Sequence, residues 1–289
     1  FIICFSISVF FTIFKDDFTL DKILKSVFIL LLFLGIFLIY SFILNKNKLT
    51  FDNSYAYYLF TLLTIYILPE LTNYKSLILI IIYLLFLRKI YSFRTSKKVI
   101  QKLFDSGLWL GVLFILEPFS ILFLMLIFTG TYLHQKITLH TIFSPIIGFI
   151  TPIFLSFTYF LWIDKTEEFI QLFSFNSSLD IQIYEAPKYF WFIISVFIVS
   201  LFALIFKTIE TLAVSNTFRR SWFLLIINLI IGVFFVGLLP VKNGAELIYV
   251  LFPVSVIIAN GIELIHKEII KNVVLYIFLI GCIYLGFSL

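Results

Sequence analysis

The side chains best suited to chemistry in this sequence are carboxylates that lie beside long apolar runs. Asp16 and Asp17 are adjacent in "FKDDF", directly after the first run. Two neighbouring carboxylates can bind a metal ion or act as acid and base, so both are candidate catalytic residues. In the alternative interpretation they belong to a solvated loop in which Lys15 is the local counter-ion.

A third candidate catalytic carboxylate, Glu117, precedes Pro118 in "FILEPF". At membrane depth a carboxylate is costly unless it is paired, hydrated or functional. The proline also frees a backbone carbonyl nearby. In the alternative interpretation, Glu117 is the apex of a loop and reaches solvent at the outer surface.

Lys242 and Glu246, in "PVKNGAELIYVLFP", are candidate substrate-binding residues. They flank a glycine turn at the expected start of a helix, where a cation could hold an anionic phosphate. The alternative is that Lys242 only balances Glu246, four residues on. No metal site is predicted, because His134, His140 and His266 form neither an HxxxH nor an HExxH pattern, and no cofactor is identified.

The composition determines which elements position these residues. Of 289 residues, 62% are hydrophobic and 13% are charged, against roughly half and a quarter in soluble domains. This excludes a water-soluble fold, because too few polar residues remain to cover a core. The net charge of +5 does not indicate nucleic-acid binding, because the Lys and Arg residues lie in short loops between apolar runs. Membrane lipids are the expected surroundings.

Apolar runs bounded by charge predict about eleven membrane spans. The runs are continuous rather than alternating, which favours helices over a β-barrel. We predict one integral membrane domain over residues 1–289, an all-α polytopic transmembrane bundle that includes one or two short hairpins. The predicted spans are 1–14, 26–44, 54–69, 74–88, 104–116, 118–133, 141–162, 187–206, 220–239, 246–264 and 272–289.

Two segments allow alternative topologies. The first run ends at Lys15, short of the roughly 20 residues that spanning needs, so we expect a truncated span. A cleaved signal peptide is the alternative. Residues 104–133 form either one long helix broken at Glu117 or a hairpin, and the distribution of loop charges favours the hairpin.

Alternate loops differ in charge, and this difference predicts the orientation. One set of loops carries fourteen Lys and Arg residues and the other set carries seven. Because cytoplasmic loops retain positive charge, the first set is placed inside, with the N-terminus inside and the C-terminus outside. The acidic, aromatic-rich segment 164–188 is then external. It either lies amphipathically on the membrane or only connects two spans.

The runs "RKIYSFRTSKKVIQKLFDSGLWLGVLFILEPFSILFL" and "VKNGAELIYVLFPVSVIIANGIE" resemble an uncharacterised Bacteroidota family of multi-pass integral membrane proteins, a domain of unknown function. The acidic pair, the acid–proline hairpin and a late K-x3-E-x2-Y-x3-P segment are similar to C-type membrane glycosyltransferases. That likeness implies a polyprenyl-phosphate-linked substrate, Asp16 or Asp17 as base and Lys242 as phosphate clamp. The chain departs from those enzymes in lacking a large periplasmic domain and an arginine near the late segment.

The sequence leaves open whether the protein is an enzyme. The leading hypothesis is an inner-membrane protein of envelope biogenesis that handles a lipid-linked sugar at an outward site lined by Asp16, Asp17, Glu117 and Lys242. One alternative is a transporter or proton-coupled subunit in which Glu117 titrates. The other is a non-catalytic scaffold of a secretion or motility complex. No protein partner is identified.

Overall fold

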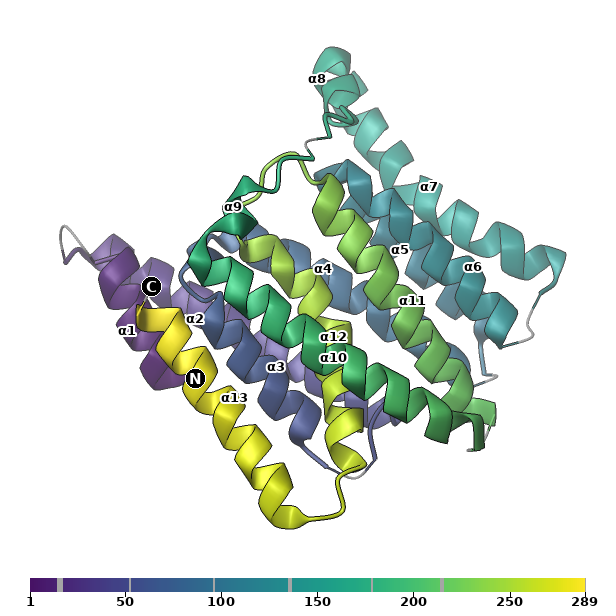
Figure 1. Ribbon diagram of the computed structural model, residues 1–289. Helices are drawn as coiled ribbons and strands as arrows, with labels where there is room; N and C mark the ends of the chain where they lie inside the picture. The colour runs from purple at the N-terminus through teal and green to yellow at the C-terminus, as the bar shows by residue number, and fades with distance from the viewer. Residues whose placement is uncertain are drawn as a thin grey trace. The chain divides into compact units, whose positions relative to one another are not determined.

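A computed structural model describes residues 1–14, 18–51, 53–95, 97–134, 137–177, 179–213 and 216–288. Within these ranges the chain forms α-helices and short 3-10 helices and no β-strand, which confirms the all-α prediction (Figure 1). Seven of the described helical segments are long and apolar enough to cross a membrane. They are Leu20–Asn47, Tyr74–Arg94, Val99–Leu116, Leu139–Trp162, Pro187–Ala213, Phe218–Leu238 and Ala245–Glu263.

Each predicted span contains a helix, but the helices differ in length. Two further apolar helices, Ile2–Thr12 and Pro118–Leu133, are shorter than the seven. Residues 54–69 hold a helix of only 12 residues. The total of about eleven spans therefore stays a prediction.

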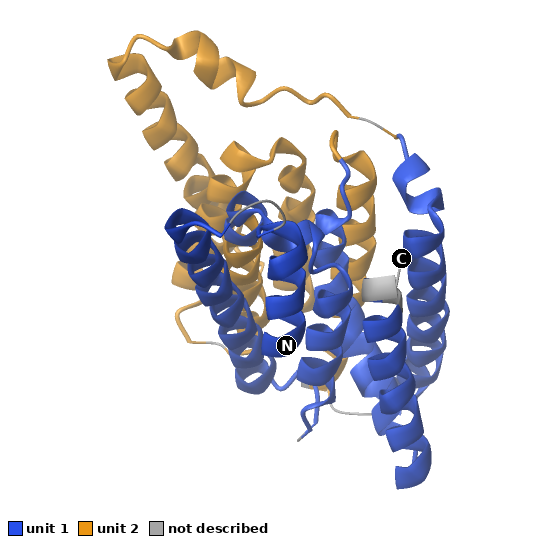
Figure 2. Ribbon diagram, turned by 90° about the vertical axis from the view of Figure 1, so that its left-hand side faces the viewer, with its two compact units in different colours: residues 1–78, 180–215, 242–289 blue, residues 79–179, 216–241 orange. Residues whose placement is uncertain are grey.

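The helices form two compact units (Figure 2). Unit 1 consists of Phe1–Ile78, Asp180–Ser215 and Lys242–Leu289, and unit 2 consists of Leu79–Leu179 and Asn216–Val241. Each unit is assembled from segments that are discontinuous in the sequence. The single integral membrane domain over residues 1–289 stays a prediction.

Unit 1 is built around helix α12. Its helices are α1 (Ile2–Thr12), α2 (Leu20–Asn47), α3 (Tyr55–Tyr66), η1 (Glu70–Thr72), α9 (Gln182–Glu185), α10 (Pro187–Ala213), η4 (Ala245–Leu247), α12 (Ile248–Glu263) and α13 (Glu268–Ser288). Helix α12 is almost wholly buried and packs against α3 and α10, while α13 packs against α3 (Figure 1). The buried Tyr40 hydroxyl hydrogen-bonds to Ser255 at 2.7 Å and donates to the carbonyl of Ala56 at 3.1 Å. These bonds join α2, α3 and α12.

Unit 2 is built around the pair α5 and α7. Its helices are most of α4 (Tyr74–Tyr91), which begins in unit 1, η2 (Ser92–Arg94), α5 (Val99–Leu116), η3 (Pro118–Phe123), α6 (Leu124–Leu133), α7 (Leu139–Trp162), α8 (Thr166–Gln171) and α11 (Asn216–Leu238). Helix α11 packs against η3 and α6. Its buried Asn228 accepts a hydrogen bond from the Tyr83 hydroxyl at 3.0 Å and donates one to Tyr91 at 3.3 Å. An amide in an apolar interior thus has partners at both ends.

Small residues let the backbones of α5 and α7 touch. A Cβ atom added at Gly107 would lie 2.1 Å from the carbonyl oxygen of Pro145, and one added at Gly148 would lie 2.2 Å from that of Phe104. A Cβ atom added at Gly111, four residues after Gly107, would lie 2.3 Å from the carbonyl oxygen of Phe149. Small residues at this spacing are typical of helix pairs that pack closely without a hydrophobic driving force between them.

This contact predicts opposite effects for two Gly→Ala substitutions in unit 2. Gly107→Ala should lower the free energy of unfolding by about 2–3 kcal/mol, because the new methyl group overlaps backbone atoms that cannot rotate away. Gly237→Ala, in α11, should raise it by about 0.5–1 kcal/mol, because open space surrounds that position and alanine favours helix. Thermal unfolding of the two purified variants measures the difference. Equal effects would contradict the close packing.

Candidate functional site

The structure distributes the predicted site residues unevenly. Asp16 and Asp17 lie outside the described residues. Glu117 belongs to unit 2, whereas Lys242 and Glu246 belong to unit 1, where they share the turn that leads into η4 and α12. The cavity proposed from all of these residues stays a prediction.

Glu117 lies where the chain of unit 2 reverses direction. Helix α5 ends at Leu116, Glu117 is extended with φ −147° and ψ 95°, and Pro118 begins η3. Both η3 and α6 pack back against α5. The chain therefore folds back at this point, as the hairpin prediction expects, rather than continuing as one long helix. The Glu117 side chain is half-buried.

The Glu246 carboxylate closes the turn before η4. Its Oε1 accepts a hydrogen bond from the backbone N–H of Gly244 at 3.0 Å, and its Oε2 accepts one from Asn243 at 3.1 Å. Oε1 also accepts a hydrogen bond from the Tyr184 hydroxyl. Burial and then this bond raise the pKa of Tyr184, so its phenol stays protonated and donates. The N–H groups of this turn are thus occupied by a carboxylate from the chain itself.

The Asn243-Gly244 pair gives the turn its shape. Gly244 has φ +93°, a conformation that favours glycine. The Asn243 Oδ1 accepts a hydrogen bond from the backbone N–H of Ala245 at 3.1 Å. A Cβ atom at Gly244 would lie 2.6 Å from the Tyr189 hydroxyl, so glycine also permits the approach of that ring.

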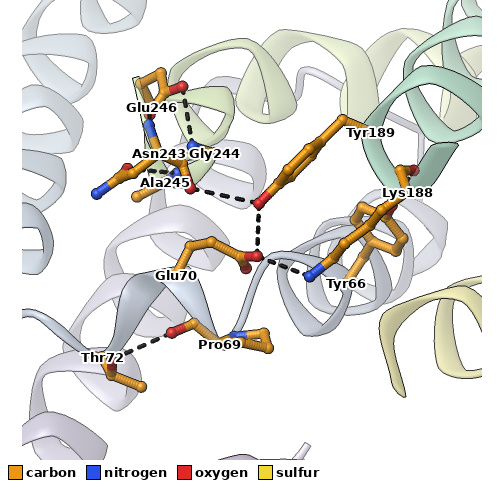
Figure 3. Close-up of polar contacts among 10 residues, drawn as sticks. All are labelled: Tyr66, Pro69, Glu70, Thr72, Lys188, Tyr189, Asn243, Gly244, Ala245 and Glu246. Carbon is orange, nitrogen blue, oxygen red and sulfur yellow. Dashed lines mark hydrogen bonds and ion pairs between the residues drawn. The ribbon is translucent and has the colours of Figure 1, made fainter. Parts of the chain in front are cut away.

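Glu70 is the second carboxylate of this region, and the sequence analysis did not select it. Its Oε1 accepts a hydrogen bond from the Tyr189 hydroxyl at 2.6 Å and forms an ion pair with the Lys188 ammonium at 2.8 Å (Figure 3). The side chains of Glu70 and Lys188 are only 12% and 19% exposed. The Tyr189 hydroxyl also lies 3.4 Å from the carbonyl oxygen of Asn243, so the tyrosine connects Glu70 to the turn that holds Glu246.

Two prolines position this pair. Pro69 follows the end of α3 and precedes η1, so Glu70 is the first residue of the 3-10 helix. Pro187 is the first residue of α10, a position that favours proline, and this places Lys188 and Tyr189 in the first helical turn. A cation in a first turn is opposed by the helix dipole. The Glu70 carboxylate offsets that cost.

We call the set Glu70, Tyr184, Lys188, Tyr189, Asn243 and Glu246 the Glu70 cluster. Within it, Glu70 Oε2 is buried and has no hydrogen-bond partner in the part of the chain that the structure describes. A carboxylate whose one oxygen is fixed and whose other oxygen is unused can accept a proton or a hydrogen bond from a bound molecule. No group of three or more His, Cys, Asp or Glu residues suited to a metal ion occurs among the described residues.

A second charge cluster, around a buried lysine, lies toward the other end of α10. The Lys207 side chain is 2% exposed, and its Nζ lies 2.7 Å from Glu210 Oε2 and 3.8 Å from Glu263 Oε2. Glu263 Oε1 accepts hydrogen bonds from the backbone N–H of Phe51 at 3.1 Å and from the Asn53 side chain. We call Lys207, Glu210 and Glu263 the Lys207 cluster.

Over the described ranges, the structure therefore defines a helical protein with seven helices of membrane-crossing length and apolarity and a polar cluster toward each end of α10. The chain belongs to a family of unknown function, DUF6427, whose model matches residues 1–288. No curated protein and no solved structure matches the chain. The expected membership of a family of unknown function is confirmed, while the link to Bacteroidota and the likeness to C-type glycosyltransferases stay predictions.

The Glu70–Lys188 pair predicts an asymmetric response to substitution. Lys188→Met should lower the free energy of unfolding by about 3 kcal/mol, because it leaves a buried carboxylate without its cation. The double variant with Glu70→Met should be more stable than the single one, because no charge is then left unpaired. Denaturant unfolding of the three proteins gives both values.

Lys165→Met provides the matched control for this experiment. Lys165 also forms an ion pair, with Glu168 at 2.7 Å, but the two side chains are 52% and 54% exposed. Its loss should change stability by less than about 1 kcal/mol, because water already screens the pair. If Lys188→Met were as mild as Lys165→Met, the Glu70 pair would have no structural role.

Proposed function

We propose that this protein is a multi-pass protein of the bacterial inner membrane, with its N-terminus inside and its C-terminus outside. The spacing of the two charge clusters supports this. The helical rise from Lys188 to Lys207 along α10 is about 28 Å, against about 30 Å for the hydrocarbon core of a bilayer. No charged residue lies between them, and that stretch exposes large apolar side chains such as Trp191, Phe197 and Phe202.

The grouping of charges in unit 1 supports the same orientation. The positive-inside count assigns Glu70, Lys188 and Glu246 to the outer side, and these residues lie together in the Glu70 cluster. It assigns Lys207, Glu210 and Glu263 to the inner side, and these form the Lys207 cluster. The contacts within unit 1 thus group the same residues that the loop charges assign to each side, and this supports one polar layer on each side of the membrane.

For the activity, we propose that the protein acts in envelope biogenesis on a lipid-linked sugar at its outer side. The observation that carries the proposal is the buried, unused Oε2 of Glu70, beside a turn that bears Lys242. Glu70 takes the proton of a hydroxyl group on the acceptor molecule. The oxygen of that hydroxyl attacks the anomeric carbon of the sugar. The bond from this carbon to the phosphate oxygen breaks, and the phosphate leaves with the electron pair. Lys242 stabilises the charge on the phosphate.

In this proposal, Asp16 or Asp17 is the alternative to Glu70 as the general base. They follow the first predicted span and so fall on the same outer side as Glu70. Asp16→Asn combined with Asp17→Asn separates the two assignments, because only one of the two sites can supply the essential carboxylate. A loss of transfer in that variant, with full transfer in Glu70→Gln, would move the base to the acidic pair.

Removal of the Glu70 charge tests the proposed transfer. In proteoliposomes supplied with a polyprenyl-phosphate-linked hexose, Glu70→Gln should lower the release of polyprenyl phosphate by at least about 100-fold, the usual effect of losing a general base. Glu185→Gln, an exposed acid in the neighbouring helix α9, should leave release unchanged. Full release by Glu70→Gln, or none by the wild-type protein, would contradict the proposal.

A second candidate function is proton-coupled transport, and the Lys207 cluster favours it. Buried ionisable residues in membrane helices often form proton paths, and unit 1 has such residues at both ends of α10. In this function Glu70 and Glu263 exchange protons with opposite sides of the membrane. Glu117, in unit 2, is the further titrating residue that this function would use.

Proton flux distinguishes the second candidate from the first. Glu263→Gln should lower proton uptake into proteoliposomes, read with a pH-sensitive dye, by at least about tenfold and leave polyprenyl phosphate release intact. Glu268→Gln is the control, because its side chain is 76% exposed. The same dye assay on Glu117→Gln tests that residue. A non-catalytic scaffold would tolerate all of these substitutions.

A further inference from the structure

Unit 1 contains an apolar groove that the proposed activity does not use. It has a volume of about 520 Å³ and is lined by α10, α12, α13 and the loop between the last two helices. Ala203 and Gly261 bring α10 and α12 into contact beside it, since a Cβ atom at Gly261 would lie 2.4 Å from that of Ala203. The volume is within the range of sites for small ligands.

The lining of the groove excludes a polar ligand in its interior. Every lining residue is apolar, and none carries a charge or a side-chain hydrogen-bonding group. The residues from α10 run from Val199 to Phe206, so the groove lies along the part of α10 that leads to Lys207. In the proposed orientation this part faces the cytoplasmic leaflet.

Basic residues follow the loop that lines the groove. Its lining includes Leu264 and Ile265, and the exposed His266 and Lys267 follow directly in the chain. Lys271 lies one turn further along α13 and pairs with Glu268 at 3.4 Å. No ion pair of Lys267 occurs within the described residues. An apolar groove that ends at an exposed lysine matches a molecule with an apolar chain and an anionic head.

We propose that this groove binds one acyl chain of an anionic phospholipid from the cytoplasmic leaflet, with the phosphate beside Lys267. The inference rests on the proposed membrane orientation but not on the proposed transfer activity. The acyl chain replaces bulk lipid along the apolar walls, and the lysine selects the head group. A lipid held in this way separates α10 from α13 along the lining and supports α12 from the side.

Two adjacent valines of α13 supply the test, because Val274 lines the groove and Val273 does not. Native mass spectrometry of the detergent-purified protein with added phosphatidylglycerol should show one retained lipid. Val274→Trp, which fills the groove, should lower its occupancy by at least about tenfold. Val273→Trp, at a 51% exposed position, should leave the occupancy unchanged. Ile277→Trp provides a second groove-filling variant that keeps the test valid if Val274→Trp does not fold.

The head group is tested with Lys267→Gln. This variant should retain the lipid but lose its preference for phosphatidylglycerol over phosphatidylcholine. Equal occupancy in Val274→Trp, Ile277→Trp and wild type, an unchanged preference in Lys267→Gln, or a second copy of the chain in place of the lipid would each overturn the proposal.

Alkaline extraction of membranes from the cells that produce the protein distinguishes failure of this proposal from failure of the membrane assignment. A protein that stays in the membrane and retains no lipid counts against the groove alone. A protein released by extraction overturns the membrane assignment and the groove together. The transfer assay on Glu70→Gln is independent, because Glu70 pairs with Lys188 at the opposite end of α10.

Discussion

Helix α10 has a lysine near each end, and each ammonium meets a carboxylate from another segment of unit 1. Lys188 pairs with Glu70 of η1, and Lys207 lies near Glu263 of α12. Because buried charges are costly unless they are paired, these contacts fix α10 against η1 at one end and against α12 at the other. The loss of one partner leaves the other as a buried charge without compensation. The arrangement of unit 1 depends on these pairs.

The helices were predictable because the apolar runs are long and uninterrupted. Every predicted span contains a helix, yet several helices extend further than the prediction. Helix α2 begins at Leu20 rather than at residue 26, because Lys22 and Lys25 end an apolar run without ending a helix. Lysine is a good helix former, so a charge marks the edge of the apolar stretch and not the edge of the hydrogen-bonded helix. The division into two units could not be predicted from any short stretch of the sequence, since it depends on contacts between distant segments.

The Glu70 cluster was only partly visible in the sequence. Glu246 and the glycine turn were selected because they are close together in the chain. Glu70 was passed over although it lies next to a proline, as Glu117 does, because its partners at 188 and 189 are far away in the sequence. Its importance comes from burial and pairing, and neither can be read from a short motif. The paired prolines before Glu70 and Lys188 were the local signal that could have found it.

The discontinuous composition of unit 1 has a consequence for its synthesis. Glu70 precedes Lys188 by 118 residues, and the turn around Glu246 follows later still. Unit 2 ends at Val241, before the last segment of unit 1 has emerged from the ribosome. Until then the Glu70 carboxylate lacks part of its network and is best accommodated in water. All of unit 2 is therefore synthesised while unit 1 is still incomplete. Unit 1 can complete its packing only after α12 has been synthesised.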